Sequence, residues 1–224
     1  MRASSNNPLR IVLLGPPGAG KGTQSELLCA RLHIPHISTG ELLREAQHAG
    51  TRLGRIATAC IDKGGLIPDE VITGVVEDRL NSARTHTGFA LDGFPRTVAQ
   101  ADGLELILHH LGVQLTAVLY YDTPEDVLIQ RLAGRWTCEG CGHIYNFDEP
   151  QSGSSKPCDI CGGKLYRRAD DNPEAIRTRF KVYHECTQPL VEYYASRRLL
   201  HTIAAIGQVE EIYLRSLQTL GISN

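Results

Sequence analysis

A glycine-rich run that begins at Gly15 reads GPPGAGKGTQ and comes directly after the four apolar residues 11–14. An apolar stretch of this length and branching is typical of a buried parallel strand. The glycines allow the backbone to turn tightly and to aim N–H groups at phosphate oxygens. Lys21 adds a positive charge, and the helix that follows contributes the positive end of its dipole. The order of strand, loop and helix therefore predicts a phosphate-binding loop.

The loop departs at one position from the commonest phosphate-binding pattern. Gly22 stands where a serine or threonine usually follows the lysine, and Thr23 comes one place later. From these residues alone, a glycine-rich turn that joins a strand to a helix and binds no ligand stays as the alternative.

Length and composition fit an ordinary globular chain. Its 224 residues, 42% hydrophobic and 21% charged, suit one α/β core with an insertion. The formal net charge of −2 argues against a surface built as a whole for nucleic acid, although it leaves room for a local basic cleft. No run approaches the roughly 20 apolar residues of a membrane span, and the N-terminus lacks the apolar centre of a secretory signal. We therefore expect a cytoplasmic protein that does not enter a membrane.

Strand-like and helix-like runs alternate along the chain. Strands are expected at 10–14, 35–37, 88–91, 116–121 and 199–206, and helices at 22–32, 41–47, 53–62, 69–80, 97–111, 124–132, 173–194 and 209–220. This alternation predicts an α/β fold with a five-stranded parallel sheet flanked by helices, whose ligands bind at the carboxyl ends of the strands. Functional residues are then expected just beyond four strands, at Gly15, Ser38, Asp92 and Asp122.

The segment 134–169 interrupts this rhythm, because it is rich in Gly, Ser, Pro and Cys, and we interpret it as a small inserted subdomain. It carries two CxxC pairs at the spacing of a four-cysteine zinc site: Cys138, Cys141, Cys158 and Cys161. Four thiolates complete a tetrahedral shell, so the metal would be structural and would stabilise a segment with few large apolar residues. Another thiophilic metal or two disulfides stay as alternatives, and His143 is expected to be a surface residue beside a complete ligand set.

Arginines gather near the expected strand ends and at both borders of the insertion: Arg44, Arg96, Arg131, Arg135, Arg168, Arg177 and Arg179. A guanidinium group binds two phosphate oxygens at once and keeps its charge in a closed cleft. Several of them beside a phosphate loop therefore indicate two phosphorylated ligands. Taken singly, an arginine is more often a solvated surface residue, and Arg177 is the weakest candidate of the set.

Asp92 follows a strand and is a candidate ligand of Mg²⁺, with a turn-forming aspartate as the alternative. We see no obvious general base for a hydroxyl acceptor. A phosphate monoester has a second pKa of about 6 and is already anionic at neutral pH, so it needs no base to accept a phosphoryl group. An acceptor nucleotide fits this pattern.

Together these motifs resemble adenylate kinases of the bacterial type with a zinc-binding lid. GPPGAGKGTQ, ISTGELLR, LDGFPRT, RLAGR, the two CxxC pairs and RRADD occur in the family's order, over nearly the whole chain. The resemblance implies the P-loop nucleoside monophosphate kinase fold. It also implies reversible transfer of the γ-phosphoryl group of MgATP to AMP, giving two ADP, with lid closure excluding water. The partners would be ATP, AMP and ADP, the cofactors Mg²⁺ and a structural Zn²⁺, and the protein a monomer that binds no nucleic acid.

The resemblance further implies roles for single residues. The residues expected to bind ATP are Gly15, Gly18, Ala19, Gly20, Lys21, Gly22, Thr23, Arg131 and Arg135. Those expected to bind AMP are Thr39, Arg44, Leu66, Ile67, Gly93, Arg96, Gln100, Arg168 and Arg179. The catalytic set would be Lys21, Arg96, Arg135, Arg168 and Arg179, and Mg²⁺ would lie near Thr23 and Asp92.

The same resemblance divides the chain into three parts. The core would comprise 9–37, 68–133 and 170–224, an AMP-binding flap would span 38–67, and the zinc-binding lid would span 134–169. One departure lies near the last strand, where Ala204 and Ala205 follow Ile203 in place of the Asp-Gly that many members carry. That loop lies by the donor base in the family, so the donor preference is left open.

Two rival functions remain from the sequence. A kinase for UMP or CMP is the rival within the same class, although Thr39, Thr97 and Gln100 look adenylate-like. A nucleic-acid-binding module whose cysteine pairs grip DNA or RNA is the rival from another class. The insertion carries few basic residues and no basic stripe with interleaved aromatics, which argues against that module.

Overall fold

Five parallel strands form the central sheet of the computed structural model, which describes residues 8–61, 63–82, 85–147 and 156–222. The spatial order is β2-β3-β1-β4-β8. The strands are β1 (Arg10–Leu14), β2 (His36–Ser38), β3 (Phe89–Asp92), β4 (Ala117–Asp122) and β8 (Leu200–Ala204). This arrangement confirms the predicted α/β fold with a five-stranded parallel sheet.

The central strand β1 is buried on both faces because its side chains alternate between two apolar cores. Val12 and Leu14 belong to one core, whereas Ile11 and Leu13 belong to the other. All four are at most 2% exposed. A continuous apolar run is what a strand of this kind requires, since each face of the sheet is covered by helices.

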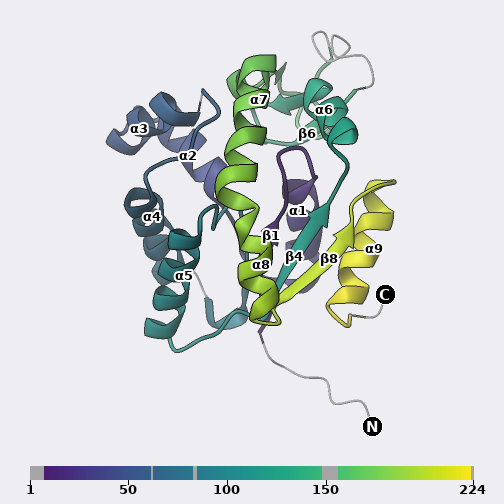
Figure 1. Ribbon diagram of the computed structural model, residues 1–224. Helices are drawn as coiled ribbons and strands as arrows, with labels where there is room; N and C mark the ends of the chain where they lie inside the picture. The colour runs from purple at the N-terminus through teal and green to yellow at the C-terminus, as the bar shows by residue number, and fades with distance from the viewer. Residues whose placement is uncertain (1–7, 62, 83–84, 148–155, 223–224) are drawn as a thin grey trace.

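Helices cover both faces of the sheet (Figure 1). The first core draws on α2 (Thr39–His48), α3 (Arg52–Ile61), α4 (Asp69–Ser82), α5 (Val98–His110) and α8 (Pro189–Ser196). The second draws on α1 (Lys21–Leu32), α6 (Glu125–Ala133), α7 (Pro173–Val182) and α9 (Val209–Thr219). Two short 3₁₀ turns, η1 (Thr85–Thr87) and η2 (Ala169–Asp171), complete the connections. None of the helices in the described part of the chain is long and apolar enough to cross a membrane.

The predicted single helix over 173–194 is wrong in one respect, because the structure divides it. A π-helical turn, η3 (Tyr183–Thr187), separates α7 from α8 in a rod that Figure 1 shows as nearly continuous. Pro189 explains the division: it has no N–H to donate, and its ring would clash with the carbonyl four residues earlier. The Gln188 N–H instead donates to the Tyr183 carbonyl, five residues earlier, at 2.8 Å.

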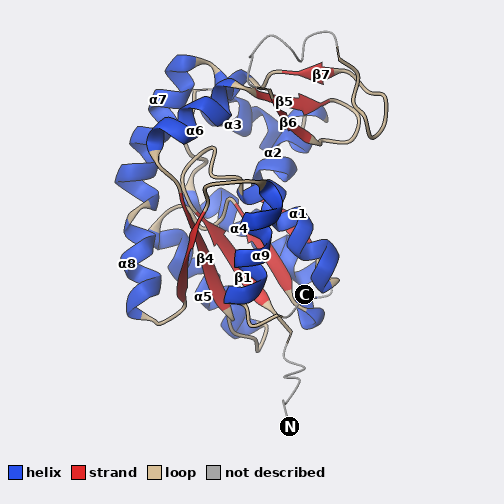
Figure 2. Cartoon of the chain, turned by 90° about the vertical axis from the view of Figure 1, so that its right-hand side faces the viewer, coloured by secondary structure: helices blue, strands red, loops and turns tan. Residues whose placement is uncertain are grey.

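The inserted segment forms a separate small sheet that stands over the carboxyl edge of the main sheet (Figure 2). Its antiparallel strands lie in the order β6-β5-β7: β5 (Arg135–Cys138), β6 (Ile144–Asn146) and β7 (Leu165–Tyr166). A minor apolar core beneath them includes Trp136 and Leu165. The predicted lid boundaries stay a prediction, and part of that segment, 148–155, lies outside the described residues.

Candidate active site and metal centre

One cleft of about 950 Å³ lies between the main sheet, the helices α2 to α4 and the inserted sheet. Every residue predicted above to bind ATP, AMP or Mg²⁺ lines this cleft. These residues come from segments as far apart in sequence as Gly15 and Arg179, and the fold brings them together because the carboxyl ends of the strands meet at one edge.

The glycine-rich loop at the floor of the cleft needs its glycines. Gly18 and Gly20 have φ values of +85° and +88°, a region that favours glycine. Gly15 also packs closely, since a Cβ there would lie 2.8 Å from the Tyr121 carbonyl oxygen. The loop then leads directly into α1, whose first N–H groups have no partner within the helix. Loop and helix together present backbone donors to an anion.

Lys21 lies at the first position of α1 and bends back over the loop. Its Nζ donates to the carbonyl oxygens of Gly15 at 2.7 Å and Pro16 at 2.9 Å. Burial of the ammonium group lowers the pKa of Lys21 to about 8, although Asp92 acts in the opposite direction. The Lys21 ammonium group is therefore fixed beside the loop, and a bound phosphate would raise the pKa of Lys21 again.

Gly22, in the first turn of α1, lies between Asp92 of the core and Ile144 of the inserted sheet. A Cβ at this position would lie 3.5 Å from Asp92 Oδ2 and 3.9 Å from Ile144 Cδ1 on β6. The departure from the commonest loop pattern thus leaves the space beside Asp92 open. Thr23 lines the same cleft, so a hydroxyl and a carboxylate, both suitable oxygen ligands for Mg²⁺, are present there.

The turn after β3 carries Arg96 and is held by several hydrogen bonds. The Arg96 N–H donates to Gln100 Oε1 at 2.7 Å, and its Nε donates to the Gly93 carbonyl at 2.8 Å. Gln100 is buried, and its amide donates to Asp69 Oδ1 at 2.7 Å. The Thr39 hydroxyl donates to the Asp92 carbonyl at 3.4 Å. Arg96 therefore projects from a rigid turn, with Thr39 close to it.

Two arginines share one buried carboxylate that the sequence analysis did not assign to the site. Asp171, whose side chain is fully buried, accepts hydrogen bonds from Arg135 Nε at 2.7 Å and from another nitrogen of the same guanidinium. Arg179 contacts Asp171 and Asp170, each at 3.0 Å. Burial raises the pKa of Asp170, but Arg179 and the neighbouring arginines outweigh it and lower the pKa below its usual value. The RRADD motif in the sequence contains both aspartates, but the sequence alone did not indicate which arginines they pair with.

Positive charge exceeds negative charge along the cleft walls. Lys21 and six arginines line the cleft against four carboxylates, those of Glu26, Glu41, Asp92 and Asp170. Arg168 donates to the Thr137 hydroxyl at 2.9 Å. Burial, together with the charges of Arg135 and Arg44, lowers its pKa. Such mutual repulsion is relieved when anions enter, so the cleft favours phosphorylated ligands.

Two of the sequence expectations do not hold at the cleft. Asp122 was expected at the functional edge, but it is exposed and does not line the cleft. The reason is that β4 continues past the last partner of β1 to pair Asp122 with Ala204 of β8, while the loop packs against Tyr121. Arg177, the weakest arginine candidate, is also exposed and outside the cleft.

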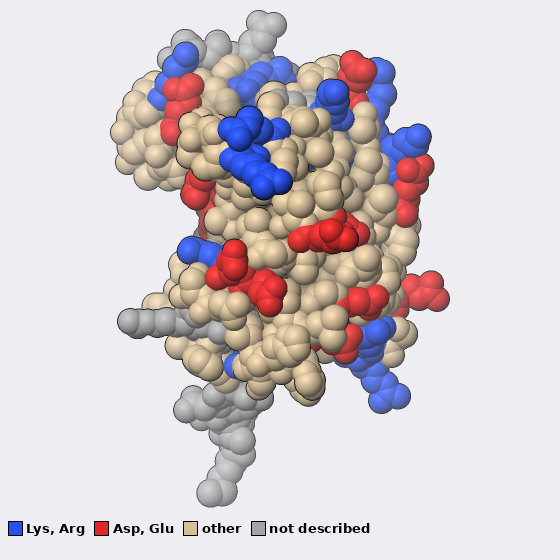
Figure 3. Space-filling model, turned by 90° about the vertical axis from the view of Figure 1, so that its left-hand side faces the viewer, with Lys and Arg blue, Asp and Glu red and all other residues tan. Residues whose placement is uncertain are grey.

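The face of the molecule beside α2 to α5 carries both signs of charge. Figure 3 shows acidic and basic side chains there, with uncharged surface between them. This distribution agrees with the formal net charge of −2. It gives no support on that face to the nucleic-acid-binding alternative, which would need a continuous basic stripe.

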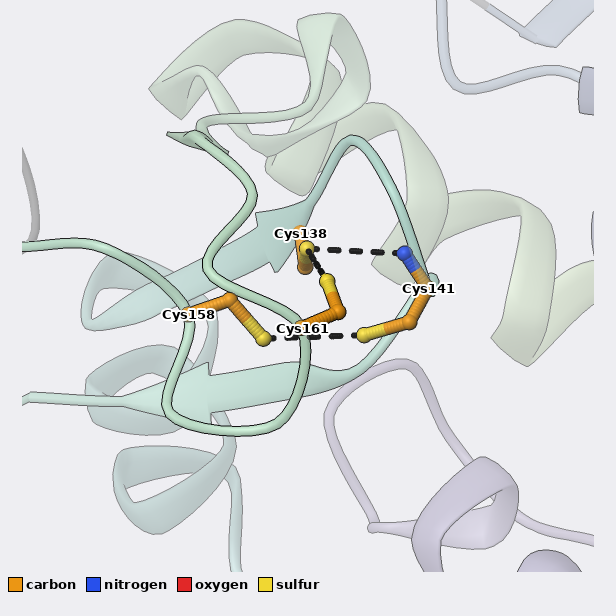
Figure 4. Close-up of side chains that lie close together, drawn as sticks. All are labelled: Cys138, Cys141, Cys158 and Cys161. Atoms are coloured by element: carbon orange, nitrogen blue, oxygen red, sulfur yellow. Dashed lines mark hydrogen bonds between the residues drawn. The ribbon is translucent and has the colours of Figure 1, made fainter.

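The four predicted metal-ligating cysteines converge at the end of β5 and on the loops beside it (Figure 4). The sulfurs of Cys138, Cys141, Cys158 and Cys161 all lie within 4.8 Å of one another. Two of the pairs, Cys138 with Cys161 and Cys141 with Cys158, have sulfurs 3.4 Å and 3.6 Å apart, well beyond the roughly 2.05 Å of a disulfide. Four soft sulfur ligands grouped in this way fit a tetrahedral Zn²⁺ with Zn–S bonds of about 2.3 Å.

Neighbouring groups support the same arrangement of sulfurs. The backbone N–H groups of Gly140 and Cys141 donate to Cys138 Sγ at 3.3 and 3.5 Å, as expected of a loop that curls around a metal-binding sulfur. The Tyr145 hydroxyl lies 3.2 Å from Cys158 Sγ. His143 is outside the cluster of four sulfurs and packs edge-on against Tyr145, with ring centroids 4.9 Å apart.

Comparison with known proteins identifies the family. The adenylate kinase family model matches residues 13–199. The chain is 46% identical over 217 residues to the adenylate kinase of Streptomyces griseus, which covers 96% of this chain and 99% of that protein. It is also 46% identical over 205 residues to the adenylate kinase of Thermodesulfovibrio yellowstonii, covering 92% of this chain and 95% of that protein. The chain therefore belongs to the adenylate kinase family.

Proposed function

We propose that this protein transfers the γ-phosphoryl group of MgATP reversibly to AMP and so produces two ADP. The observation that carries the proposal is the convergence of Lys21 and six arginines on one cleft that also contains the glycine-rich loop. One nucleotide cannot use so many cations spread over two sides of a cleft, whereas two phosphate chains that meet end to end can.

The donor nucleotide would lie along the loop. Its β and γ phosphates would meet the backbone N–H groups of the loop and Lys21, with Arg131 and Arg135 on the opposite wall. Arg131 donates to the Ala205 carbonyl at 3.1 Å, which holds it beside the loop after β8. Donor phosphates bound in this way receive charge stabilisation without any covalent step by the protein.

The acceptor would lie between α2, α3 and the turn after β3. Arg44 and Arg96 would bind the phosphate of AMP, and the base and sugar would meet the remaining cleft residues: Thr39, Leu66, Ile67, Gly93 and Gln100. Arg168 and Arg179, together with Arg135, would face the transferring group between the two nucleotides. An AMP phosphate is anionic at neutral pH, so no general base is required.

Thr23 and Asp92 would hold Mg²⁺ near the donor phosphates, either directly or through water. The ion would neutralise charge on the β and γ oxygens when bound. The zinc bound by the four cysteines would have a structural role only, because four thiolates leave no open position for a reactant.

The inserted sheet, 134–169, would act as a lid and the segment 38–67 as a flap over AMP, while the rest of the chain from residue 9 forms the core. Ile144 of the proposed lid lies close to Gly22 in the first turn of α1, which supports closure of the lid directly over the donor phosphates. Closure would exclude water, which would otherwise compete with AMP as the acceptor.

The experiment that tests the proposal is a coupled assay of ADP formation from ATP with AMP, CMP, UMP or GMP as the acceptor. We expect AMP to give the highest kcat/KM by a wide margin. A preference for a pyrimidine acceptor would replace the AMP assignment with the UMP/CMP kinase alternative. Failure to form any diphosphate would overturn the reaction itself.

A further inference from the structure

The rod formed by α7, η3 and α8 contributes four residues to the lining of the cleft: Arg179, Val182, Tyr183 and Thr187. Arg179, Tyr183 and Thr187 are four residues apart and all line the cleft, as i, i+4 spacing on one helical face requires. Arg179 has an assigned place in the proposed reaction. Tyr183 and Thr187, which belong to the π-helical turn, have none.

Thr187 makes a specific contact with the turn that carries Arg96. Its hydroxyl donates a hydrogen bond of 2.9 Å to the Arg96 carbonyl oxygen, across 91 residues of sequence. Thr187 is 7% exposed, so little water is available to replace this bond. Loss of the hydroxyl would leave a main-chain acceptor without this partner.

The other main-chain group of Arg96 is also held by a buried side chain. Gln100 accepts from the Arg96 N–H at 2.7 Å, and Gln100 is in turn held by Asp69. The Thr97 hydroxyl donates to the same Asp69 at 3.0 Å. The Arg96 backbone is therefore fixed on one side by α4 and α5, and on the other side by Thr187.

Thr187 is the last residue of the π-helical turn. Pro189 interrupts the regular helical hydrogen bonds, and the Gln188 N–H reaches back five residues to Tyr183. The extra residue in this turn changes the rotation of α8 relative to α7. The Tyr183 hydroxyl, 3.5 Å from the Tyr120 hydroxyl on β4, attaches the same turn to the main sheet.

We infer that Thr187 is a positioning residue that fixes the Arg96 turn for the acceptor phosphate and ties it to the rod that carries Arg179. This inference rests on the proposed function, because it assigns Arg96 to the phosphate of AMP. Thr187 acts through Arg96 and has no proposed contact with the reacting atoms. A precise setting of Arg96 matters because small misplacements of a charge lower the rate steeply.

The test is steady-state kinetics of Thr187→Val, which removes the hydroxyl and nearly keeps the volume. We expect kcat/KM for AMP to fall roughly tenfold, as for loss of a hydrogen bond to a buried group, with KM for ATP within about twofold of the wild-type value. Thr187→Ser, which restores the hydroxyl, should return kcat/KM for AMP to near the wild-type value.

Thr219→Val is the matched control. Thr219 also donates to a main-chain carbonyl, that of Arg215 at 2.8 Å, but it lies in α9 away from the cleft. Its kinetics should equal those of the wild type. Equal loss of ATP and AMP kinetics in Thr187→Val, or no loss at all, would overturn the inference.

A direct binding measurement covers the case in which Thr187→Val folds poorly. Thr187→Ala removes the hydroxyl without adding bulk, and calorimetric titration with AMP alone should show a weaker Kd than in Thr187→Ser. Equal Kd values would overturn the positioning role. Activity of the wild-type enzyme separates the two claims: an inactive wild type contradicts the proposed function, whereas an active wild type with an unselective Thr187→Val contradicts only this inference.

Discussion

The role of each charged residue at the cleft depends on the groups that surround its charge. Lys21 is half-buried and bonded to two loop carbonyls, and burial lowers its pKa to about 8 from the ordinary value of 10.5. Asp171 is fully buried but shared by two guanidinium groups. The Lys21 ammonium group can therefore still bind a ligand, whereas the Asp171 carboxylate is fully paired with Arg135 and Arg179.

Replacement of Lys21 by Met should lower kcat by roughly 10²–10³-fold, because a charge aimed at the transferring group is lost. The fold should persist, as judged by circular dichroism and thermal unfolding. Lys181→Met is the control, since Lys181 is exposed and contacts only Glu185 at 4.0 Å among the ion pairs described. An active Lys21→Met enzyme would remove Lys21 from the catalytic set.

The depressed pKa of Lys21 also sets a pH dependence. The ammonium form is required for phosphate binding, so kcat/KM for ATP should fall as pH rises through about 8. Between pH 8 and 10.5 the unfolded chain binds more protons at this lysine than the folded protein, so this group makes the free energy of unfolding rise with pH there. A pH profile in which kcat/KM for ATP does not fall near pH 8 would contradict a Lys21 pKa lowered by burial.

Replacement of Asp171 by Asn should destabilise the protein and weaken catalysis together. A buried pair that loses one charge costs about 3–5 kcal/mol. We expect about 2–3 kcal/mol here, because both arginines reach some solvent and Arg179 keeps Asp170. Urea unfolding gives the free energy. The control is Glu185→Gln, at the exposed ion-pair partner of Lys181, which should change the free energy of unfolding by less than about 0.5 kcal/mol. Equal effects of the two substitutions would contradict the role of Asp171 as a carboxylate shared by two arginines.

Among the elements, those with strong periodicity were predictable from the sequence. The run 11–14 predicted a buried strand, and α1, α4, α5 and α9 lie close to the expected ranges. Asn172, expected to precede a helix because Pro173 and Glu174 follow it, accepts N–H groups of the first turn of α7. Local signals of this kind are sufficient because each depends on neighbouring residues only.

Other elements could not be predicted, because they depend on contacts between distant segments that the sequence does not reveal. The strands of the inserted sheet are as short as two residues, Leu165–Tyr166, and carry no readable period. The division of the long helix follows from Pro189, but a proline near a helix end can equally begin a new helix or kink an old one. Its consequence, the Thr187 hydroxyl on the Arg96 carbonyl, joins segments 91 residues apart.

The inserted sheet is the element whose stability depends on the cysteines. Its apolar core is small, with Trp136 and Leu165 as the main members besides two of the cysteines. Cys138→Ser with Cys141→Ser should abolish stoichiometric zinc and lower the unfolding temperature of this segment, while the main sheet stays folded. Metal analysis and hydrogen exchange would measure both effects.

Cys186→Ser is the control for the cysteine pair, because Cys186 lies in η3 outside the sulfur cluster. It should keep zinc content and stability at wild-type values. The same unfolding curve with and without Cys138 and Cys141 would contradict a structural metal.

At the scale of the whole molecule, the site is made by the meeting of distant segments. The motifs beyond the strands and the family resemblance predicted many of the residues that line the cleft, but they could not predict which of these residues touch. Ile144 illustrates this, because nothing in the pattern of the insertion indicated that its side chain lies beside Gly22 in the first turn of α1. Such contacts depend on how the two sheets are placed together.

The position of Ile144 beside Gly22 leads to a prediction about water exclusion. Ile144→Ala shortens a side chain that lines the cleft near Gly22. A loss of about 1.4 kcal/mol of apolar contact in the closed form would lower the ratio of closed to open protein roughly tenfold. Phosphoryl transfer to water should then rise relative to transfer to AMP. The measurement is the ratio of released phosphate to ADP formed, with ATP and AMP both present.

Ile160→Ala is the matched control in the same inserted segment, because Ile160 is 64% exposed and does not line the cleft. It should leave the ratio unchanged, and an equally unchanged ratio in Ile144→Ala would mean that this side chain does not help to keep water from the donor phosphates.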